Sequence, residues 1–284
     1  MPLTTLSNGR QAVIVTAADG ATAIVYEQGA QVASWIPAGG KEVMFVSPNS
    51  IYKDGTSIRG GVPICWPQFS DMGAGAAHGH VRKAKWDFVE DGVGTVTFSL
   101  RVKPDDAANQ WSIDAELHCI VNVSSAELSV AFRIKNLAES DASFNLALHT
   151  YFAISSIHNV TIHGLDNCTW ADNMRKREKF APEEIRRIDK ETDRIYLDVE
   201  GPVTISDPQN ARNIVIQGAG LPDVVLWNPW IERTQKFVDL VETGYLDFVC
   251  VEHGAIGKPV VLAKGQTWEG AQVIAVQAQT SSKI

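Results

Sequence analysis

The sequence predicts an all-β fold, and three observations support this prediction. Apolar and polar residues alternate with a period of two through most of the 284 residues, as they do in half-buried strands. Turn sequences such as Asp19-Gly20 separate the alternating runs. Helical periodicity is limited to the short segments 183–188 and 231–240. So many strands without crossover helices favour antiparallel sheets that stack in two layers or close into a barrel.

The expected strands follow one another along the whole chain. In the N-terminal half the alternating runs are residues 11–17, 21–27, 94–102, 111–123, 126–134 and 144–152. In the C-terminal half they are residues 159–165, 202–207, 213–218, 223–228, 247–253 and 271–276. The mixed-charge stretch 175–194 is the least strand-like, and we expect most of it to be a solvated loop. No low-complexity linker or repeat divides the chain, so we predict one domain over residues 1–284 with a polar tail.

Charge and composition limit the partners of the protein. The formal net charge of −8 disfavours nonspecific binding to nucleic acid or to an anionic membrane surface. The first residues lack the apolar core of a signal peptide, and no apolar run is long enough to cross a bilayer. Cys65, Cys119, Cys168 and Cys250 are scattered without paired spacing, which favours free thiols. We therefore expect a cytoplasmic monomer.

The end of the chain leaves a second localisation open. Its last three residues, Ser282-Lys283-Ile284, resemble the Ser-Lys-Leu signal that peroxisomal import receptors read. The alternative to the cytoplasm is therefore a peroxisome-type organelle such as the glycosome.

One rigid, cationic segment differs from the strand pattern around it. The sequence RGGVPICWPQF (59–69) is followed by HGHVR (78–82). Its glycines permit tight turns and its prolines stiffen the backbone. Arginines held in so rigid a segment, Arg59 and Arg82, suit an anionic ligand. A structural turn with incidental arginines is the alternative.

Two residues in alternating runs are candidates for acid–base chemistry. His149 faces the same side of its run as Tyr151, and Glu252 faces the same side as Phe248 and Cys250. A carboxyl group that follows two apolar residues is expected to be partly buried, and burial raises its pKa toward the range of a general base. A hydrogen-bonded core histidine and a carboxylate that reaches water at a strand end are the alternatives.

The sequence does not favour a metal site or a nucleophilic hydrolase. The HGH of residues 78–80 resembles half of a cupin metal site, but the cations Arg82, Lys83 and Lys85 follow it where such a site has a glutamate. Neither a G-x-S-x-G elbow nor a glycine-rich phosphate loop is present. We therefore predict that the protein uses no metal and no cofactor.

Six short motifs occur in an order that is typical of one family. They are RGGVPICWPQF, HGHVR, LHTYF (148–152), TDRIY (192–196), WNPW (227–230) and CVEHG (250–254). On these motifs the chain resembles the hexose-6-phosphate mutarotases, or glucose-6-phosphate 1-epimerases, of the aldose 1-epimerase superfamily. The resemblance spans about residues 5–276, and it implies an antiparallel β-supersandwich of the galactose-mutarotase type.

The resemblance also implies roles for individual residues. His149 matches the catalytic histidine of the family and Glu252 its catalytic glutamate. The substrate-binding residues that it implies are Arg59, Arg82, Asp193, His78, Gln68 and Trp227. Among them the two arginines suit the phosphate, because guanidinium groups match phosphate oxygens. Asp193 falls where the family binds sugar hydroxyls, and His78 falls near the ring oxygen or the anomeric centre.

The implied reaction is the interconversion of the α and β anomers of hexose 6-phosphates, chiefly glucose 6-phosphate. Glu252 takes the proton of the C1 hydroxyl while protonated His149 donates to the ring oxygen, and the same pair closes the ring on the other face after rotation about C1–C2. A mutarotase of unphosphorylated aldoses, a noncatalytic carbohydrate-binding β-sandwich, and a structural or regulatory protein on the same scaffold are the alternatives.

The chain departs from the family pattern at His80-Val81, at Ala77 and at Ser70. Family members often read HGFAR where this chain has HGHVR, and Ala77 precedes the motif where a polar residue is frequent. Ser70 follows Phe69 where glycine is common. The arginines are intact, so these departures affect the expected sugar specificity more than phosphate binding.

Overall fold

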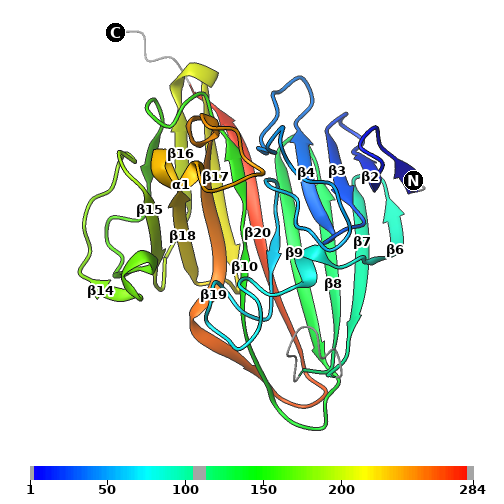
Figure 1. Ribbon diagram of the computed structural model, residues 1–284. Coiled ribbons are helices and arrows are strands. Elements are labelled where there is room, and N and C mark those ends of the chain that lie inside the picture. The colour runs from blue at the N-terminus through cyan, green and yellow to red at the C-terminus, as the bar shows by residue number, and fades with distance from the viewer. Residues whose placement is uncertain (1–2, 105–112, 280–284) are drawn as a thin grey trace.

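The computed structural model describes residues 3–104 and 113–279, and the strands in these residues form three sheets. The first sheet has four strands in the order β1 (Thr4–Thr5), β2 (Gln11–Thr16), β3 (Thr22–Tyr26) and β4 (Gln31–Ile36). This sheet lies at one end of the molecule, and strand β14 (Glu178–Phe180) lies at the other (Figure 1). The tripeptide Ser282-Lys283-Ile284 is outside the described residues.

The second and third sheets have eight strands each among the described residues. The second sheet runs in the order β14, β13 (Trp170–Asp172), β15 (Thr192–Tyr196), β18 (Asp223–Asn228), β19 (Phe248–Leu262), β10 (Ala142–Leu148) and β5 (Ile64–Cys65). Its eighth strand, β11 (Tyr151–Ala153), pairs with β19. The third sheet runs in the order β12 (Thr161–His163), β16 (Val203–Asp207), β17 (Arg212–Ala219), β20 (Thr267–Ala278), β9 (Glu127–Asn136), β8 (Ala115–Val123), β7 (Thr95–Val102) and β6 (Asp87–Gly92).

Helical structure is sparse in the described part of the chain. The α-helix α1 (Trp230–Thr234) follows β18, and the 3-10 helices are η1 (Val81–Lys83), η2 (Asn173–Arg175), η3 (Pro208–Asn210) and η4 (Gly244–Leu246). None of these helices combines the length and the hydropathy that a membrane span requires.

The predicted all-β class is confirmed, with corrections to individual elements. Each alternating run contains a strand, and the helix predicted at 231–240 is the shorter α1. The helix predicted at 183–188 is wrong, because this segment has no regular secondary structure. Ile185 and Ile188 are both buried and lie three residues apart, a spacing that is typical of a helix but occurs here in an irregular segment. Seven strands of the described residues were not predicted: β1, β4, β5, β6, β13, β14 and β15. Strand β19 continues to Leu262 through Gly257 and Pro259, residue types that argue against a strand.

The two faces of the second sheet have different neighbours. Leu146, Leu148 and Val251 belong to the main apolar core, together with Ile214 and Ile274 of the third sheet. On the other face, Ala147 and Ile256 belong to one small apolar cluster and Tyr151 and Cys250 to another. The alternation predicted for the run 144–152 is therefore confirmed, and the second face remains available for a site.

Candidate active site

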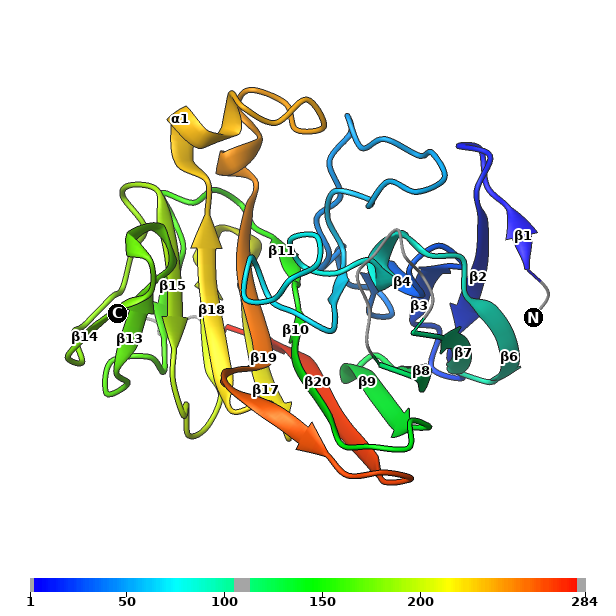
Figure 2. The same cartoon turned by 60° about the horizontal axis from the view of Figure 1, so that its bottom comes forward.

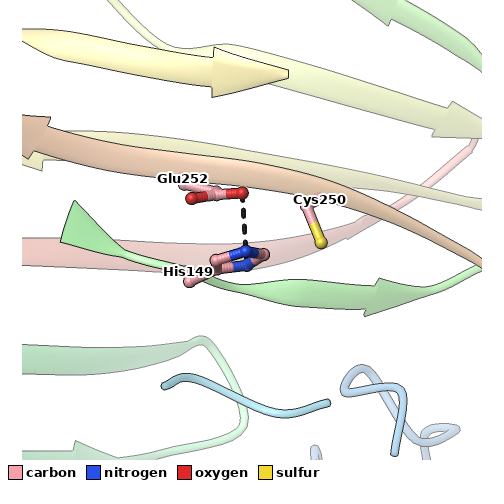
Figure 3. Close-up of side chains that lie close together, drawn as sticks. All are labelled: His149, Cys250 and Glu252. Atoms are coloured by element: carbon pink, nitrogen blue, oxygen red, sulfur yellow. Dashed lines mark ion pairs between the residues drawn. The ribbon is translucent and has the colours of Figure 1, made fainter. Parts of the chain in front are cut away.

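The register of β19 with β10 and β11 brings His149 and Glu252 together. Leu148 pairs with His253 and Tyr151 pairs with Cys250, so His149 lies opposite Glu252 where β10 ends and β11 has not begun. Directly opposed residues of antiparallel strands point to the same face. His149 Nδ1 lies 3.2 Å from Glu252 Oε1 (Figure 3). The two candidates for acid–base chemistry are thus one cross-strand pair.

The strands beside this pair extend the same face. Asp193 on β15 pairs with Trp227 on β18, which pairs with Cys250 on β19, which pairs with Tyr151 on β11. These four residues form one row across four strands. The segment between β4 and β5 closes the end of the row, because Phe45 N donates to Tyr151 O; Figure 2 shows that segment beside β11. A continuous sheet face therefore forms the floor of the site.

A cavity of about 650 Å³ covers this floor. Seven of the residues predicted as site residues line it: Arg59, His78, Arg82, His149, Asp193, Trp227 and Glu252. These residues are distant in sequence, and the tertiary fold brings them into one pocket.

Gln68 is the predicted residue that the structure does not bring into this cavity. Its Nε2 atom donates to the Ser70 and Gly75 carbonyl oxygens at 3.1 and 3.2 Å, and its Oε1 atom accepts from Gly75 N at 2.9 Å. It lines a separate, smaller cavity of about 230 Å³. Gln68 therefore shapes the loop that leads to His78, and the structure gives it no contact with the pocket.

Burial and aromatic contacts define the state of His149. Its ring stacks on that of Tyr151, with centroids 4.9 Å apart and planes at 9°, and it meets His78 and Trp227 edge-on at 5.4 and 5.6 Å. Burial lowers the pKa of His149 well below its ordinary value, and His78, Arg82 and Arg59 lower it further. Burial therefore favours the neutral imidazole.

Glu252 is shifted in the opposite sense. Burial raises its pKa well above the ordinary value, Asp193 raises it further, and Arg82 opposes the shift. Its Oε2 atom has no hydrogen-bond partner among the described residues, and the Nδ1 atom of His149 has none besides its approach to Glu252 Oε1. Burial favours the state in which Glu252 carries the proton and His149 is neutral, and both groups keep hydrogen-bonding capacity for a ligand.

Cys250 completes a cluster with the pair, and its ligand atoms lie within 4.8 Å of those of His149 and Glu252 (Figure 3). The set of donor types could hold a metal ion. Burial raises the pKa of the Cys250 thiol well above its ordinary value, and the cations Arg59 and Arg82 line the same cavity. A cationic ligand is therefore disfavoured here.

His78 reaches the cavity through an unusual backbone. Its φ is +62°, and at the next residue, Gly79, a Cβ atom would lie 1.9 Å from the Trp66 carbonyl oxygen. His78 Nδ1 accepts a hydrogen bond from Ser70 N at 3.2 Å. Burial, helped by Arg82 and Arg59, lowers the pKa of His78 to about 3. His78 is therefore a neutral imidazole whose proton lies on Nε2, ready to be donated to a ligand.

The two predicted arginines are held differently. Arg59 donates from Nε to Asp239 Oδ2 and from Nη1 to Tyr151 Oη, both at 3.2 Å, and its guanidinium group lies 4.5 Å from the centre of the Phe237 ring. Arg82 donates from Nη2 to Ala77 O at 3.1 Å, and its buried Nε has no hydrogen-bond partner among the described residues. Both cations retain donors for an anion.

The structure adds site residues that the sequence did not indicate. Arg233 of α1 lines the cavity and lies 5.7 Å from the Phe237 ring. Asn173 donates to Asp193 Oδ2 at 3.0 Å, while burial raises the pKa of Asp193 to about 6. No motif marks Arg233 or Asn173, because only the packing of separate loops brings them to the pocket.

Comparison with known proteins shows the family of the chain. The family model for aldose 1-epimerase matches residues 11–275. A curated protein of Cenchrus ciliaris, named "putative glucose-6-phosphate 1-epimerase", is 32% identical, over 97% of this chain and 87% of its own. A protein of Escherichia coli K12 with the same name is 32% identical, over 88% and 85%. The crystal structure of a "putative mutarotase" from Salmonella typhimurium superposes with a TM-score of 0.84 at 27% identity and covers 98% of this chain and 97% of that one.

The shared fold is therefore that of the mutarotases, and the sequence match extends over nearly the whole chain. The protein belongs to the aldose 1-epimerase family.

Proposed function

We propose that the protein interconverts the α and β anomers of hexose 6-phosphates, with glucose 6-phosphate as the chief substrate. The observation that carries the proposal is the pair His149–Glu252, with 3.2 Å between Nδ1 and Oε1, in a cavity that also presents Arg59 and Arg82. The names of the relatives in Cenchrus ciliaris and Escherichia coli point to the same substrate.

The reaction needs one base and one acid. Glu252, as a carboxylate, takes the proton of the C1 hydroxyl, and the electrons of that O–H bond form the carbonyl at C1. The C1–O5 bond breaks, and O5 takes the proton of the His149 imidazolium. The aldehyde then rotates about C1–C2, and the reverse transfers close the ring on its other face. Proton transfers of this kind contribute about 10²–10⁴-fold each.

The other cavity residues hold the sugar while its ring is open. Arg59 and Arg82 bind the phosphate at the end remote from C1, where guanidinium groups match phosphate oxygens. The Nε2 proton of His78 and the carboxylate of Asp193 bind sugar oxygens and hydroxyls, and the indole face of Trp227 packs on the apolar face of the ring. These contacts keep the open-chain aldehyde in place.

Exchange between anomers, measured by NMR, tests the proposal. Glucose 6-phosphate, free glucose and free galactose are compared with the purified protein and with the Glu252→Gln variant. We expect acceleration that is strongest for glucose 6-phosphate and that the variant abolishes. Acceleration of the free sugars alone would make the protein an epimerase of unphosphorylated aldoses. Saturable line broadening without exchange would make it a binding protein.

A further inference from the structure

We propose that the substrate phosphate does more than anchor the sugar: it moves the proton of the His149–Glu252 pair from the carboxyl group to the imidazole. The inference rests on the proposed function, and it concerns how the two ends of the cavity communicate. It follows from the arrangement of charges around the pair.

The charged and titratable groups that face His149 come from four elements and from the two segments that flank β5. They are Glu252 and Cys250 on β19, Tyr151 on β11, Asp193 on β15, Arg82 on η1, and Arg59 and His78 on the segments that flank β5. Cys250 and Tyr151 are neutral, because burial raises the pKa of each thiol and phenol group, and His78 is neutral as well. The charges that remain are those of Arg59 and Arg82, of Asp239, which pairs with Arg59 at 3.2 Å, and of the Asp193 carboxylate, which acts on Glu252.

In the empty site these cations act against an imidazolium. Moving the proton from Glu252 to His149 creates a dipole with its positive end at His149, close to Arg59 and Arg82. Burial opposes both charges of that dipole. The empty protein therefore keeps the proton on the carboxyl group, which is the wrong state for starting the reaction.

The two arginines do not act equally on the two members of the pair. Arg59 donates to Tyr151 Oη at 3.2 Å, and the Tyr151 ring stacks on His149 at 4.9 Å. Arg59 thus contacts His149 through Tyr151, and its charge lowers the pKa of His149. Arg82, in contrast, lowers the pKa of both His149 and Glu252. A charge placed at Arg59 therefore changes His149 more than Glu252.

A bound phosphate dianion reverses the sign of the charge at this end. Arg59, Arg82 and Asp239, which pairs with Arg59, together carry one net positive charge, and the dianion turns it into one net negative charge. This negative charge favours an imidazolium at the end of the pair next to Arg59. The dipole with His149 positive and Glu252 negative then becomes favourable. This is the protonation state that ring opening consumes.

The same argument explains why burial is useful in the reaction. Ring opening carries one proton from His149 to O5 and one from O1 to Glu252, so the open-chain intermediate leaves both groups neutral. Burial favours this neutral state and the phosphate favours the charged one. Together they bring the two states closer in free energy, which suits a reaction that must run equally well in both directions.

The first test observes His149 by NMR in protein labelled with ¹⁵N-histidine, with His149→Ala used for assignment. Inorganic phosphite serves as the probe, because it carries the dianion without a sugar. We expect saturating phosphite at neutral pH to raise the protonated fraction of His149 about tenfold, which corresponds to a shift of about one pH unit in its titration. Sodium chloride of equal ionic strength should have no such effect. Saturable binding of phosphite that leaves the His149 resonances unprotonated would overturn the inference.

The second test measures anomer exchange of free glucose with and without phosphite. We expect saturating phosphite to accelerate it about tenfold in the wild-type protein, since the population of imidazolium rises by that factor. Arg59→Ala removes a cation that disfavours the imidazolium, so we expect it to exchange free glucose faster than wild type without phosphite and to gain less from saturating phosphite bound at Arg82. Arg133→Ala, an exposed arginine paired with Glu269 on the third sheet, is the matched control and should behave as wild type.

The outcomes separate this inference from the proposed function. If glucose 6-phosphate is turned over but bound phosphite leaves free glucose unaccelerated, the phosphate is an anchor only and the inference is wrong. If glucose 6-phosphate itself is not turned over, the proposed function is wrong, and the NMR titration of His149 still reports whether an anion at the arginines changes its protonation.

Discussion

The second and third sheets have the same number of strands among the described residues but a different regularity. From β17 through β20, β9 and β8 to β7, the third sheet pairs in unbroken registers. In the second sheet the β10–β19 register shifts between Phe144 and Leu146, and β10 gives way to β11 at His149 and Thr150. Every predicted site residue that reaches the cavity lies on the second sheet or on the loops over it.

This difference has a physical reason. Regular pairing satisfies backbone groups and buries apolar side chains, which stabilises a fold, and the polar side chains buried with them, such as Gln272 on β20 and Asn136 on β9, are hydrogen-bonded. An interrupted strand frees space beside its neighbours, and a polar pair can then be buried there and remain partly unpaired. We infer that the third sheet supplies stability and the second sheet supplies the site, and each prediction below tests that division.

The largest effect is expected for the catalytic pair on the second sheet. Glu252→Gln and His149→Ala should each lower the rate of anomer exchange by about 10²–10⁴-fold, because each removes one proton transfer. Circular dichroism should show the fold intact. Glu269→Gln, on an exposed part of β20, is the matched control and should keep the wild-type rate. A near-normal rate in either site variant would contradict the assigned roles.

The opposite behaviour is expected in the core of the third sheet. Phe132 on β9 is fully buried and packs edge-on against Trp86 at 6.1 Å. Phe132→Ala should lower the free energy of unfolding by about 3–5 kcal/mol, since it leaves a cavity. Denaturant unfolding measures this loss. At a temperature where the variant is folded, its rate of anomer exchange should equal that of the wild type. A reduced rate would contradict the inference that the third sheet contributes stability and not activity.

Arg59 lies on a loop over the second sheet, and we expect its effect to depend on the substrate. Arg59→Ala should raise KM for glucose 6-phosphate by about 10–100-fold, the value of a lost charge-assisted hydrogen bond. Kinetics with free glucose provide the comparison. Equal losses on the phosphorylated and the free sugar would show that Arg59 does not bind the phosphate.

Asp193 should produce a pH effect of smaller size. Burial raises the pKa of Asp193 to about 6, so its carboxylate, the form that accepts hydrogen bonds from sugar hydroxyls, is lost as pH falls below about 6. We expect kcat/KM to fall there by up to about tenfold per pH unit. Asp193→Asn should lower kcat/KM at pH 8 and should lack this part of the pH profile. A profile unchanged by the substitution would place the titration elsewhere.

The smallest effect is that of Glu252→Gln on stability. The substitution should raise the stability of the protein, although it lowers the activity. The pKa of Glu252 in the folded protein lies well above 4.5 because of burial, so above pH 4.5 the folded state binds more protons than the unfolded chain. Stability from this group is therefore lost as pH rises. Glu252→Gln should raise Tm more at pH 8 than at pH 5, by a few degrees, given about 2–4 °C per kcal/mol for a domain of this size. Equal shifts at both pH values would show that Glu252 does not titrate abnormally.

Much of the fold could be predicted from the sequence because strand alternation is a local signal. It placed His149 and Tyr151 on one face of their run and Phe248, Cys250 and Glu252 on one face of theirs, and the structure confirms that these two faces meet. It failed for β13 and β14, which are short. It also failed for the C-terminal half of β19, because Gly257 and Pro259 are unfavourable in a strand that pairing with its neighbours stabilises.

The sequence by itself determined the all-β class, the faces of the strands and, through six motifs, the family. Only the tertiary structure decided that His149 stands opposite Glu252, that Arg233 joins the cavity, and that Gln68 turns away to bind its own loop. The reason is the range of each effect. Alternation and motifs depend on neighbouring residues, whereas register, loop packing and the burial that shifts a pKa depend on segments that meet only after folding.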